Sequence, residues 1–469
     1  MINEEGQMVL FSDLASAVNK FQENISQLGL EKQNSSIAIW TEKSVNAIVM
    51  IQAILSSGNG YIPINNDWPS DRVKFILENT GTATLIVDEN RCSIASDLLN
   101  EMGVQFTMVR IDGNFYLFSF KSIRKIRLPK ALSYILFTSG STGYPKGIVH
   151  TNESAFTFLK WCLKEFKSYK IKRHVSIAPL NFDLSVFDVF HPIVNTSTLF
   201  VPASSIISNT RLFAKYVNDH KIESLYTTPS YLNLLEQTGK LSAYDFKHVK
   251  LILIAGEALS SDLVKRLKVH FKKATFYNLY GPTETNVCCA YKIDFKKLSG
   301  EYIPIGKSII KGNIKLSKQG ELLYKGKLLM SGYINDKGYQ ALRRNSVYKT
   351  GDFVTCDKNG LLNFIGRKDN LVKRNGFRIE LNEINKALQK HSSIGRCESL
   401  FIKEDSQIVS FVESADDLSQ LALKSFCLSH LPSYMVPDLI MVLRKIPVNL
   451  NHKVDQTALR KMYAQSFKS

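Results

Sequence analysis

The sequence predicts an α/β protein with a large N-terminal domain, made of parallel-rich sheets plus a β-rich lobe, and a small α+β C-terminal domain. Three changes of pattern lead to this prediction. Short apolar runs first alternate with helical stretches, which is typical of parallel sheets covered by helices. From about Ile303, short strand patterns are separated by glycine turns. A strand–helix pattern returns after Arg367, so we place the domain boundary between residues 1–368 and 369–469.

The individual elements follow from these patterns in chain order. Ser36–Trp40 (SIAIW) is short and apolar, which predicts a buried strand, and Val45–Leu55 is apolar and long enough for a helix. Further short apolar runs predict strands at Leu85–Val87, Tyr134–Thr138, Leu199–Val201, Leu225–Thr227 and Leu251–Ala255. The glycines that separate the strands of the β-rich lobe are Gly312, Gly320, Gly326, Gly332, Gly360 and Gly366. In the second domain we expect helices at Ile384–Leu388 and Leu418–Leu431 and a strand at Ile408–Val412.

Length and composition restrict the class of protein. The chain has 469 residues, more than one hydrophobic core usually supports, so at least two domains are expected. Hydrophobic residues make up 44% and charged residues 22%, which excludes wholesale disorder. No apolar run approaches the length of a membrane span, and the polar, acidic start at Met1–Glu5 is unlike a signal peptide. Seven cysteines without a Cys-x-x-Cys pair predict a reduced cytoplasmic protein without a zinc site. We expect no membrane partner.

The chain is strongly basic, with 60 Lys and Arg against 42 Asp and Glu and a net charge of +18. This excess is spread along the chain rather than gathered with aromatic residues in one arm, so we expect no nucleic-acid binding. A lysine-rich solvated surface is one explanation of the charge. Attraction to an acidic protein partner or an anionic substrate is the other.

The segment Tyr134–Gly147 (YILFTSGSTGYPKG) carries the clearest chemistry. An apolar strand enters a loop of glycines and hydroxyl residues followed by Lys146. Exposed backbone N–H groups, hydroxyls and an ammonium together suit a polyphosphate. The spacing is not that of a Walker P-loop, because Gly140 is not followed by Gly-Lys-Ser/Thr at the required distance.

This loop resembles the phosphate-binding loop of the adenylate-forming superfamily, which includes acyl-CoA synthetases, luciferases and the adenylation domains of non-ribosomal peptide synthetases. Other segments resemble further motifs of the family in the family's order: Gly60–Arg72 (GYIPINNDWPSDR), Asn181–Phe190 (NFDLSVFDVF), Ala255–Leu259 (AGEAL), Asn278–Glu284 (NLYGPTE), Gly320–Tyr333, Tyr348–Asp352 (YKTGD), Gly366–Glu380 and Asn451–Asp455 (NHKVD). The resemblance extends from about Leu10 to Leu459. It implies that a carboxylic acid attacks the α-phosphate of ATP, forming an acyl-adenylate and pyrophosphate.

The resemblance also implies roles for residues in these motifs. The β- and γ-phosphates would be held by the loop residues Thr138, Ser139, Gly140, Ser141, Thr142, Gly143 and Lys146. Glu284 would ligate Mg²⁺, as a hard carboxylate oxygen should, and Thr283 would contact the α-phosphate. Tyr280 would stack on adenine, while Asp352 and Arg367 would hold the ribose. The remaining nucleotide contacts would come from Gly256, Glu257, Asn278 and Gly281.

Lys453 matches the catalytic lysine of the family and would bridge the substrate carboxylate and the α-phosphate, which otherwise repel each other. Asp369 matches the family's hinge, about which a mobile C-terminal domain turns between adenylation and thiol attack. The family usually has glycine before the lysine, whereas this chain has His452, which resists some backbone angles that glycine allows.

Asp183 distinguishes the subclasses of the family. Amino-acid-activating domains use this aspartate to pair with the substrate ammonium, whereas acyl-CoA synthetases and luciferases generally lack it. A helix N-cap before Leu184–Phe190 is the structural alternative. Aligned by motif, the pocket would be closed by Asp183 and Lys453 and lined by Leu184, Phe187, Tyr226, Leu253, Ala255, Leu279, Val287 and Cys288. We interpret Cys288 as lining only, and His150 is not assigned a role.

This apolar lining disfavours charged or amide substrates, whose polar groups would stay unpaired. The set closely resembles that of stand-alone enzymes that adenylate L-proline and load it onto a peptidyl carrier protein for pyrrole formation. Leucine is usual there at the position of Phe187, so the larger ring could shrink the pocket and keeps alanine or another small amino acid open.

Three functional interpretations are compared. The chain ends a few residues after the last motif without a carrier domain, so we expect a small amino-acid substrate and a discrete phosphopantetheinylated carrier protein as partners. An acyl- or aryl-CoA ligase is the second interpretation, and Asp183 argues against it. The third is an inactive scaffold, which would have no chemical need for Lys146, Glu284, Asp352 and Lys453 together.

Overall fold

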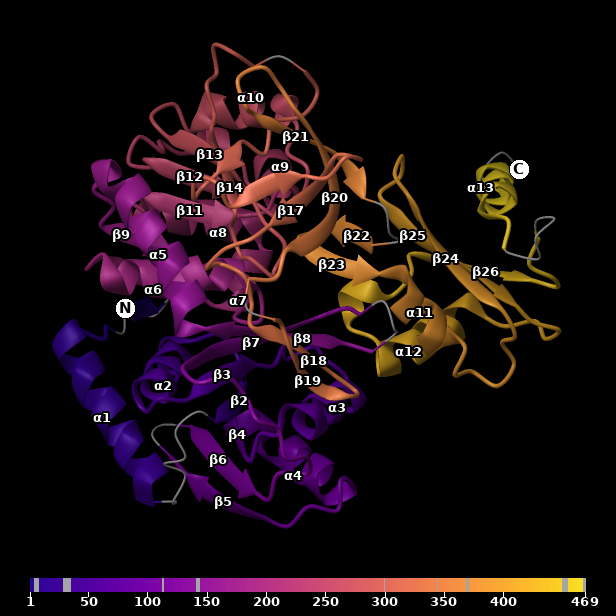
Figure 1. Cartoon of the computed structure of the whole chain (residues 1–469), viewed down its shortest axis with the longest axis horizontal. Coiled ribbons are helices and arrows are strands. Elements are labelled where there is room, and N and C mark those ends of the chain that lie inside the picture. The colour runs from indigo at the N-terminus through magenta and orange to yellow at the C-terminus, as the bar shows by residue number, and fades with distance from the viewer. Residues whose placement is uncertain are drawn as a thin grey trace. The chain divides into compact units, whose positions relative to one another are not determined.

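The computed structural model of the chain describes residues 1–3, 8–27, 35–111, 114–140, 144–298, 300–343, 345–367, 371–448 and 454–466 (Figure 1). The chain forms two compact units. The first unit contains Met1–Asn66, Leu77–Phe137 and Gly147–Lys368, and the second contains Asp67–Ile76, Thr138–Lys146 and Asp369–Ser469. The roles of these units as a substrate-binding core and a mobile lid stay predictions.

A nine-stranded mixed sheet has the order β19-β18-β8-β7-β3-β2-β4-β6-β5. Its strands are β2 (Ser36–Trp40), β3 (Gly60–Pro63), β4 (Thr84–Asp88), β5 (Phe106–Arg110), β6 (Phe115–Phe120), β7 (Leu132–Thr138), β8 (Lys146–Thr151), β18 (Gly332–Asn335) and β19 (Gly338–Ala341). The helices of this part of the chain are α1 (Phe11–Gln27), α2 (Val45–Ser56), α3 (Ser70–Thr80) and α4 (Cys92–Glu101). Helix α2 begins where the Ser44 side chain accepts a hydrogen bond from the Ala47 N–H, and its apolar residues are buried.

An eight-stranded sheet has the order β1-β10-β9-β11-β12-β13-β14-β15 and carries three of the predicted pocket residues, Tyr226, Leu253 and Leu279. Its strands are β1 (Ile2–Asn3), β9 (Arg173–Val175), β10 (Thr198–Val201), β11 (Ser224–Thr227), β12 (Leu251–Ile254), β13 (Thr275–Tyr280), β14 (Cys289–Lys292) and β15 (Lys307–Ser308). Pairing is parallel from β1 to β13 and antiparallel beyond. This confirms the predicted α/β fold with parallel-rich sheets.

The two faces of this sheet pack against different helices because side chains alternate along each strand. On β12, Leu251 and Leu253 join one core with α5 (Asn152–Phe166) and α6 (Leu184–Val194). Ile252 and Ile254 join another core with α8 (Thr210–Asp219), α9 (Pro229–Thr238) and α10 (Ser261–His270). Helix α7 (Ser204–Ser208) precedes α8. Single 3-10 turns lie at Glu89–Arg91, Lys167–Tyr169, Leu241–Ala243 and Ser433–Met435.

The β-rich lobe is a four-stranded antiparallel sheet in the order β16-β17-β20-β21. Its strands are β16 (Ile314–Leu316), β17 (Glu321–Tyr324), β20 (Tyr348–Cys356) and β21 (Leu362–Arg367). The register pairs Asp352 with Arg367 across β20 and β21. This pairing brings together two residues predicted to hold the ribose.

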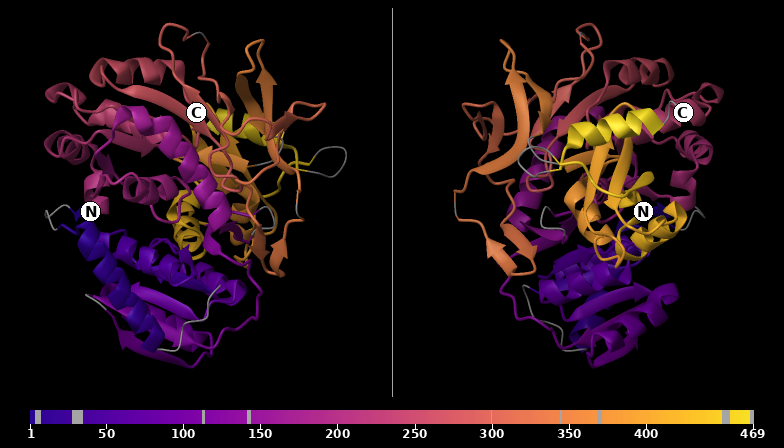
Figure 2. Two further views of the ribbon diagram at one scale, coloured as in Figure 1. Left: turned by 60° about the vertical axis from the view of Figure 1, so that its left-hand side comes forward. Right: turned by 90° about the vertical axis from the view of Figure 1, so that its right-hand side faces the viewer.

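The second unit contains β22 (Leu371–Arg374) and β23 (Phe377–Glu380), and a three-stranded sheet of β24 (Cys397–Ile402), β25 (Gln407–Glu413) and β26 (Leu439–Leu443). Its helices include α11 (Leu381–Leu388), α12 (Gln420–His430) and α13 (Gln456–Ser466). On β25, Ile408 and Val412 pack with α11 and α12, while Val409 and Phe411 pack with α13. Figure 2 shows α13, in yellow, lying across this sheet. The alternation confirms the predicted strand at Ile408–Val412.

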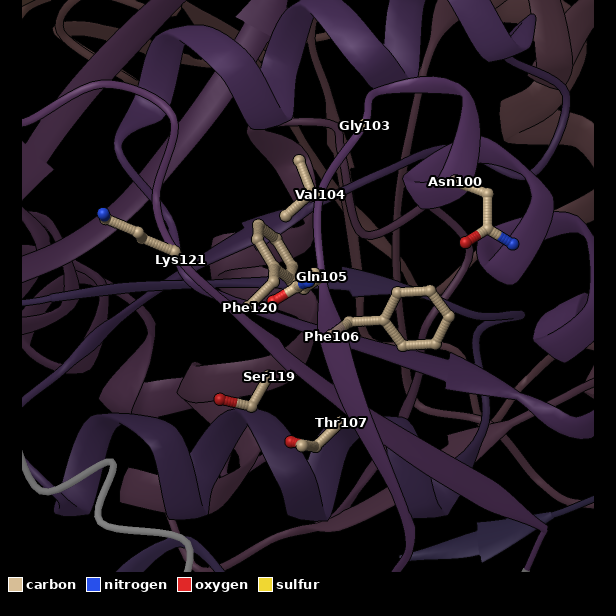
Figure 3. Close-up of a pocket in the computed structure, with 9 residues that line it drawn as sticks. All are labelled: Asn100, Gly103, Val104, Gln105, Phe106, Thr107, Ser119, Phe120 and Lys121. Atoms are coloured by element: carbon tan, nitrogen blue, oxygen red, sulfur yellow. The ribbon is translucent and has the colours of Figure 1, made fainter.

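The first unit has a recess on its surface, apart from the predicted site. An open recess of about 880 Å³ lies where the end of α4 meets β5 and β6, lined by residues that include Asn100, Phe106, Phe120 and Lys121 (Figure 3). It contains none of the predicted site residues. Over the described part of the chain, no helix combines the length and the apolar character needed to cross a bilayer.

Candidate active site

The loop 176–183 joins β9 to α6 and ends at Asp183. Asp183 stands at the N-cap position with helical backbone angles, φ −65° and ψ −23°, and its side chain makes no capping hydrogen bond. Asp183 is therefore the N-cap residue, as the structural alternative expects, but its side chain does not cap the helix. Its carbonyl accepts from Asn286 Nδ2 at 3.3 Å. Burial raises the pKa values of Tyr134 and Tyr226, and the negative charge of Asp183 adds to both shifts, so the carboxylate lies near both phenols.

The predicted pocket residues gather on one face of the eight-stranded sheet, the face packed with α5 and α6. All eight belong to a single buried core: Leu184, Phe187, Tyr226, Leu253, Ala255, Leu279, Val287 and Cys288. Phe187 is 1% exposed, and its ring meets Tyr226 edge-to-face at 5.4 Å and stacks on His191 at 4.5 Å. Phe187 is thus held by ring contacts on more than one side.

The turn at residues 281–286 presents Thr283 and Glu284. A Cβ added to Gly281 would lie 1.6 Å from the Asn286 carbonyl oxygen, so the turn requires glycine at this position. Glu284 is fully buried, and its carboxylate accepts from the Tyr333 hydroxyl at 3.0 Å. Its backbone carbonyl accepts from Met330 N at 2.8 Å.

His150 on β8 supports the same turn, although sequence reasoning gave it no role. Its Nε2 lies 2.8 Å from the Thr283 carbonyl oxygen and its Nδ1 lies 2.9 Å from Ser154 Oγ. Burial lowers the pKa of His150 to about 4, against the opposing effects of the Thr283 carbonyl and Glu284. A neutral imidazole with its proton on Nε2 donates to Thr283, because a carbonyl can only accept.

The predicted ribose and adenine residues form a polar cluster around Asp352, which is fully buried. Arg367 donates to Asp352 Oδ1 at 2.5 Å and to the Thr350 carbonyl at 3.1 Å. The Tyr280 hydroxyl donates to Asp352 Oδ2. Burial raises the pKa of this phenol well above its ordinary value, and the Asp352 charge adds to the shift. The phenol therefore stays protonated and can act as this donor.

Other residues predicted to touch ATP have internal partners. The Asn278 amide donates to the carbonyls of Ile303 and Pro304, at 3.3 and 2.9 Å. Glu257 follows Gly256, whose φ is +99°, and accepts from Ser230 N at 3.0 Å at the start of α9. Through these contacts, Asn278 and Glu257 each bind backbone groups of a neighbouring segment, in addition to their predicted role toward a nucleotide.

The phosphate loop begins in the second unit at Thr138, Ser139 and Gly140. Among the described residues, the buried Thr138 Oγ1 has no hydrogen-bond partner. Ser139 Oγ donates to the Arg378 carbonyl at 2.6 Å and accepts from Glu380 N at 3.0 Å. The Gly140 N–H donates to Glu383 Oε2 at 3.2 Å. Lys146 opens β8 and is partly buried.

A buried ion pair holds Glu383 in this position. Arg72 Nη1 lies 2.6 Å from Glu383 Oε1, and both side chains are about 5% exposed or less. Arg72 also lies over the Trp68 ring, 4.8 Å from its centroid. The carboxylate that binds the phosphate loop is therefore fixed by a cation within the same unit.

The sequence pattern of the AMP-binding enzymes matches residues 1–338, well over half of the 469-residue chain. The chain belongs to the AMP-binding enzyme family. It is an adenylation domain, an ATP-using ligase of the AMP-forming kind.

Several relatives of this adenylation domain share most of its length. An L-proline–[L-prolyl-carrier protein] ligase of Pseudomonas fluorescens is 29% identical, and the match covers 97% of this chain and 94% of that protein. Gramicidin S synthase 2 of Aneurinibacillus migulanus is 28% identical over 97% of this chain but only 10% of its own length. The fold is similar to that of the Vibrio cholerae adenylation domain AlmE, solved with glycyl-adenosine-5'-phosphate, at a TM-score of 0.82 and 22% identity over 98% of this chain and 94% of that one.

Some predicted residues of the adenylation domain lie outside the described residues. These are the predicted catalytic residue Lys453 with its neighbour His452, the predicted hinge Asp369, and the loop residues Ser141, Thr142 and Gly143. Their roles stay predictions.

Sequence reasoning missed two further groups, Lys43 and Asp188, which hold the loop before Asp183. Asp188 lies five residues after Asp183, inside the NFDLSVFDVF motif, but its partners His174, Ile177 and Ala178 precede that motif. Lys43 lies outside every motif that we identified.

Proposed function

We propose that this adenylation domain activates an amino acid, specifically L-proline, as an aminoacyl-adenylate and transfers it to the phosphopantetheine thiol of a separate carrier protein. The feature that carries the proposal is Asp183, a carboxylate that directly precedes α6, whose residues Leu184 and Phe187 belong to the buried apolar core that contains all the predicted lining residues. Asp183 is partly buried, and partial desolvation strengthens the attraction of a carboxylate for a substrate ammonium.

The predicted lining residues favour a substrate with a compact aliphatic side chain. Among the predicted lining residues, aliphatic and aromatic groups dominate and no second charge is present. A charged or amide side chain would lose its hydrogen bonds with water there without finding partners. The fixed ring of Phe187 also favours a small substrate, so alanine is the second candidate.

Adenylation needs the substrate carboxylate to attack the α-phosphorus of ATP while the bond to pyrophosphate breaks. In the proposal, Tyr280, Asp352 and Arg367 orient the adenosine, and Thr283 contacts the α-phosphate. The ammonium of Lys453 reduces the repulsion between the carboxylate and the phosphate. In the second step the carrier thiol attacks the acyl carbon, and AMP leaves.

Magnesium fits the donor set around Glu284. The described residues contain no cluster of three or more His, Cys, Asp or Glu side chains able to enclose a metal. Mg²⁺ usually takes one or two carboxylates together with phosphate and water oxygens, so the single buried Glu284 is a suitable protein ligand. When bound, the ion would neutralise phosphate charge.

The test is amino-acid-dependent ATP–pyrophosphate exchange with the purified chain. Proline, alanine, glycine, serine, valine and benzoate are compared, each with wild type, Asp183→Ala and the surface control Asp219→Asn. We expect proline-selective exchange that is lost in Asp183→Ala and kept in Asp219→Asn. Alanine-selective exchange would keep amino-acid activation and reject proline. Exchange with benzoate that survives Asp183→Ala would instead identify an aryl ligase.

Transfer is tested separately by incubation with ATP, the preferred amino acid and either a phosphopantetheinylated carrier protein or coenzyme A. Intact-protein mass spectrometry should show the aminoacyl mass on the carrier, removed by hydroxylamine. The carrier lacking phosphopantetheine is the control. Formation of aminoacyl-CoA, with no mass change on the carrier, would contradict the proposed partner.

A further inference from the structure

The loop 176–183 begins with an unusual backbone arrangement at residues 176–178. The carbonyl oxygens of Ser176, Ile177 and Ala178 all accept from Lys43 Nζ, at 2.8, 3.1 and 3.2 Å. In an extended strand neighbouring carbonyls alternate in direction, so three in a row do not reach one cation. The chain therefore leaves the strand conformation where β9 ends, and the three donors of the ammonium are all used.

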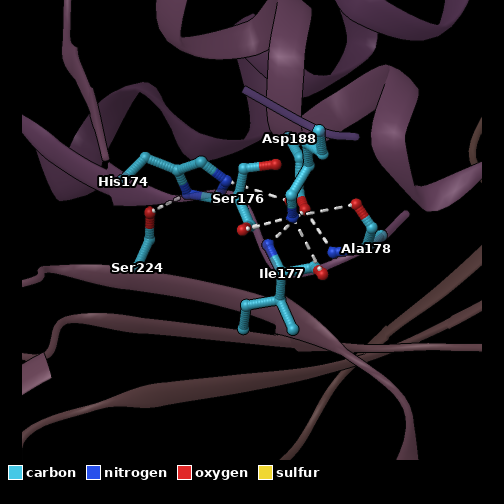
Figure 4. Close-up of polar contacts among 7 residues, drawn as sticks. His174, Ser176, Ile177, Ala178, Asp188 and Ser224 are labelled. Atoms are coloured by element: carbon cyan, nitrogen blue, oxygen red, sulfur yellow. Dashed lines mark hydrogen bonds and ion pairs between the residues drawn. The ribbon is translucent and has the colours of Figure 1, made fainter. Parts of the chain in front are cut away.

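The amides of two of these residues, Ile177 and Ala178, converge on a second charge. Asp188 Oδ2 accepts from Ile177 N at 2.9 Å and from Ala178 N at 3.0 Å. Asp188 Oδ1 lies 3.0 Å from His174 Nε2, and His174 Nδ1 lies 2.6 Å from Ser224 Oγ. Figure 4 shows these contacts around the fully buried Asp188. Successive N–H groups that face one anion form a nest, which requires this local fold.

The two charges hold opposite sides of one short backbone segment, and they compensate each other. Burial lowers the pKa of Lys43 to about 8, while attraction to Asp188 opposes the shift. Lys43 comes from the segment between β2 and α2, and Asp188 comes from α6. Charged groups from two separate parts of the first unit thus determine the path of residues 176–178.

The rest of the loop continues this fixed path to Asp183. Ser185 Oγ donates to the Leu180 carbonyl at 3.0 Å, and the Asn65 amide donates to Asn181 Oδ1 at 3.3 Å. Proline follows at position 179, which restricts the backbone further. A displacement at residues 176–178 would therefore be transmitted to Asp183 rather than absorbed on the way.

We propose that Lys43 and Asp188 are positioning residues for amino-acid recognition: by clamping the carbonyls of residues 176–178 and the amides of Ile177 and Ala178, they place Asp183 for the substrate ammonium. This inference rests on the proposed function of Asp183. Neither residue touches the substrate, and both act through the loop.

The main test is Lys43→Met, which keeps the length and the apolar stem but removes the ammonium. We expect the KM for the preferred amino acid in pyrophosphate exchange to rise about 10- to 100-fold, since small misplacements of substrate-orienting groups have effects of this size. The KM for ATP should stay within about twofold, a free-energy change below 1 kcal/mol. A general loss of stability would not change the KM for the amino acid while leaving the KM for ATP unchanged.

Lys268→Met is the matched control. Lys268 Nζ also donates to backbone carbonyls, those of Lys272 and Ala274 at 2.8 and 2.9 Å, but it lies at the end of α10. Its substitution should leave the amino-acid KM unchanged. Lys43→Arg keeps a cation, so its amino-acid KM should rise less than that of Lys43→Met. Asp188→Asn keeps an acceptor, so its amino-acid KM should also rise less than that of Lys43→Met.

A double-mutant cycle links the clamp to Asp183. In an Asp183→Ala background, Lys43→Met should add little to the amino-acid KM, because the group that it positions is already gone. Full additivity of the two effects would overturn the inference. So would an equal rise of both KM values in Lys43→Met.

Amide hydrogen exchange separates this inference from the proposed function, because it needs no turnover. In Lys43→Met, peptides that cover 176–183 should exchange faster than in wild type, and peptides of α10 should not. If the wild-type protein activates no amino acid, the proposed function fails. If Lys43→Met leaves the amide hydrogen exchange of residues 176–183 unchanged, the proposed clamp itself is overturned.

Discussion

Two loops carry groups predicted to bind substrate, and their backbones are held in different ways. The loop 176–183 is held by Lys43 and Asp188, and these contacts involve only backbone groups that precede Asp183. At the start of the phosphate loop, the groups held are the Ser139 hydroxyl and the Gly140 N–H, which are themselves predicted to bind phosphate. The first set of contacts holds backbone groups that are not predicted to bind substrate, whereas the second holds groups that are themselves predicted to bind phosphate.

This difference predicts different behaviour toward the two substrates. At Gly140, a phosphate would have to displace the Glu383 carboxylate, because two anions do not share one N–H donor favourably. ATP binding should therefore respond to changes at Glu383, and amino-acid binding should not.

The largest expected effect is at Asp183. Asp183→Ala should lower kcat/KM for the amino acid about 1,000-fold, or about 4 kcal/mol, since the substrate ammonium would lose its charged partner. Pyrophosphate exchange at varied amino acid and saturating ATP measures this loss. A decrease in kcat/KM of less than tenfold would show that Asp183 is not the principal partner of the substrate ammonium.

The second effect concerns the stability of the second unit. Arg72→Met should lower the free energy of unfolding by about 3 kcal/mol, because it leaves the buried Glu383 carboxylate without its cation. Denaturant unfolding followed by fluorescence measures the change. Arg266→Met, which removes partly exposed ion pairs with Glu236 and Asp262, is the control and should cost less than about 1 kcal/mol.

A third prediction concerns acid stability. Burial holds His150 neutral, with its pKa lowered to about 4 from an ordinary value of 6.5, so the unfolded state takes up a proton first as the pH falls. Stability should drop between these two values by up to about 1.4 kcal/mol per pH unit for this group. His191, whose pKa burial lowers to about 3, acts in the same direction.

His150→Asn tests this prediction, because asparagine can donate to the Thr283 carbonyl without titrating. The slope of stability against pH should be shallower in the variant between about pH 4 and 6.5, and parallel to that of wild type near pH 8. Identical slopes in the acidic window would reject His150 as the source.

The smallest expected effect sharpens the comparison of the two loops. Glu383→Gln should lower the KM for ATP about threefold, less than 1 kcal/mol, because a neutral amide competes less well with phosphate for the Gly140 N–H. The amino-acid KM should not change. An increase in the KM for ATP would mean that Glu383 assists phosphate binding instead of opposing it.

Much of the fold was predictable because local pattern and burial agree. The strand at Ser36–Trp40 and the helix that begins at Val45 match the structure, since their residues are apolar and buried along their length. The hairpin of β5 and β6 was not predicted. Strand β5 is an edge strand with mostly exposed residues, including Met108 and Val109, so its sequence lacks the clear apolar signal of a buried strand.

The candidate site was predictable only where its residues are close in sequence. The turn with Thr283 and Glu284 and the start of the phosphate loop were identified from short motifs. The support of that turn by His150 was not, because the contact joins residues 133 positions apart. Nor did the local pattern indicate that Ser139 and Gly140 bind Arg378, Glu380 and Glu383, more than 230 positions later in the chain.

The sequence by itself determined the alternation of strands and helices, the family and the identity of the reactive groups, because each depends on the order of nearby residues. Only the tertiary structure decided which groups hold those residues in place. Lys43 lies 133 residues before Ser176, and no local pattern indicates that its ammonium binds three consecutive carbonyls. The physical reason is that hydrogen bonds and charge compensation depend on distance in space, which the chain sets only when its sheets and helices pack together.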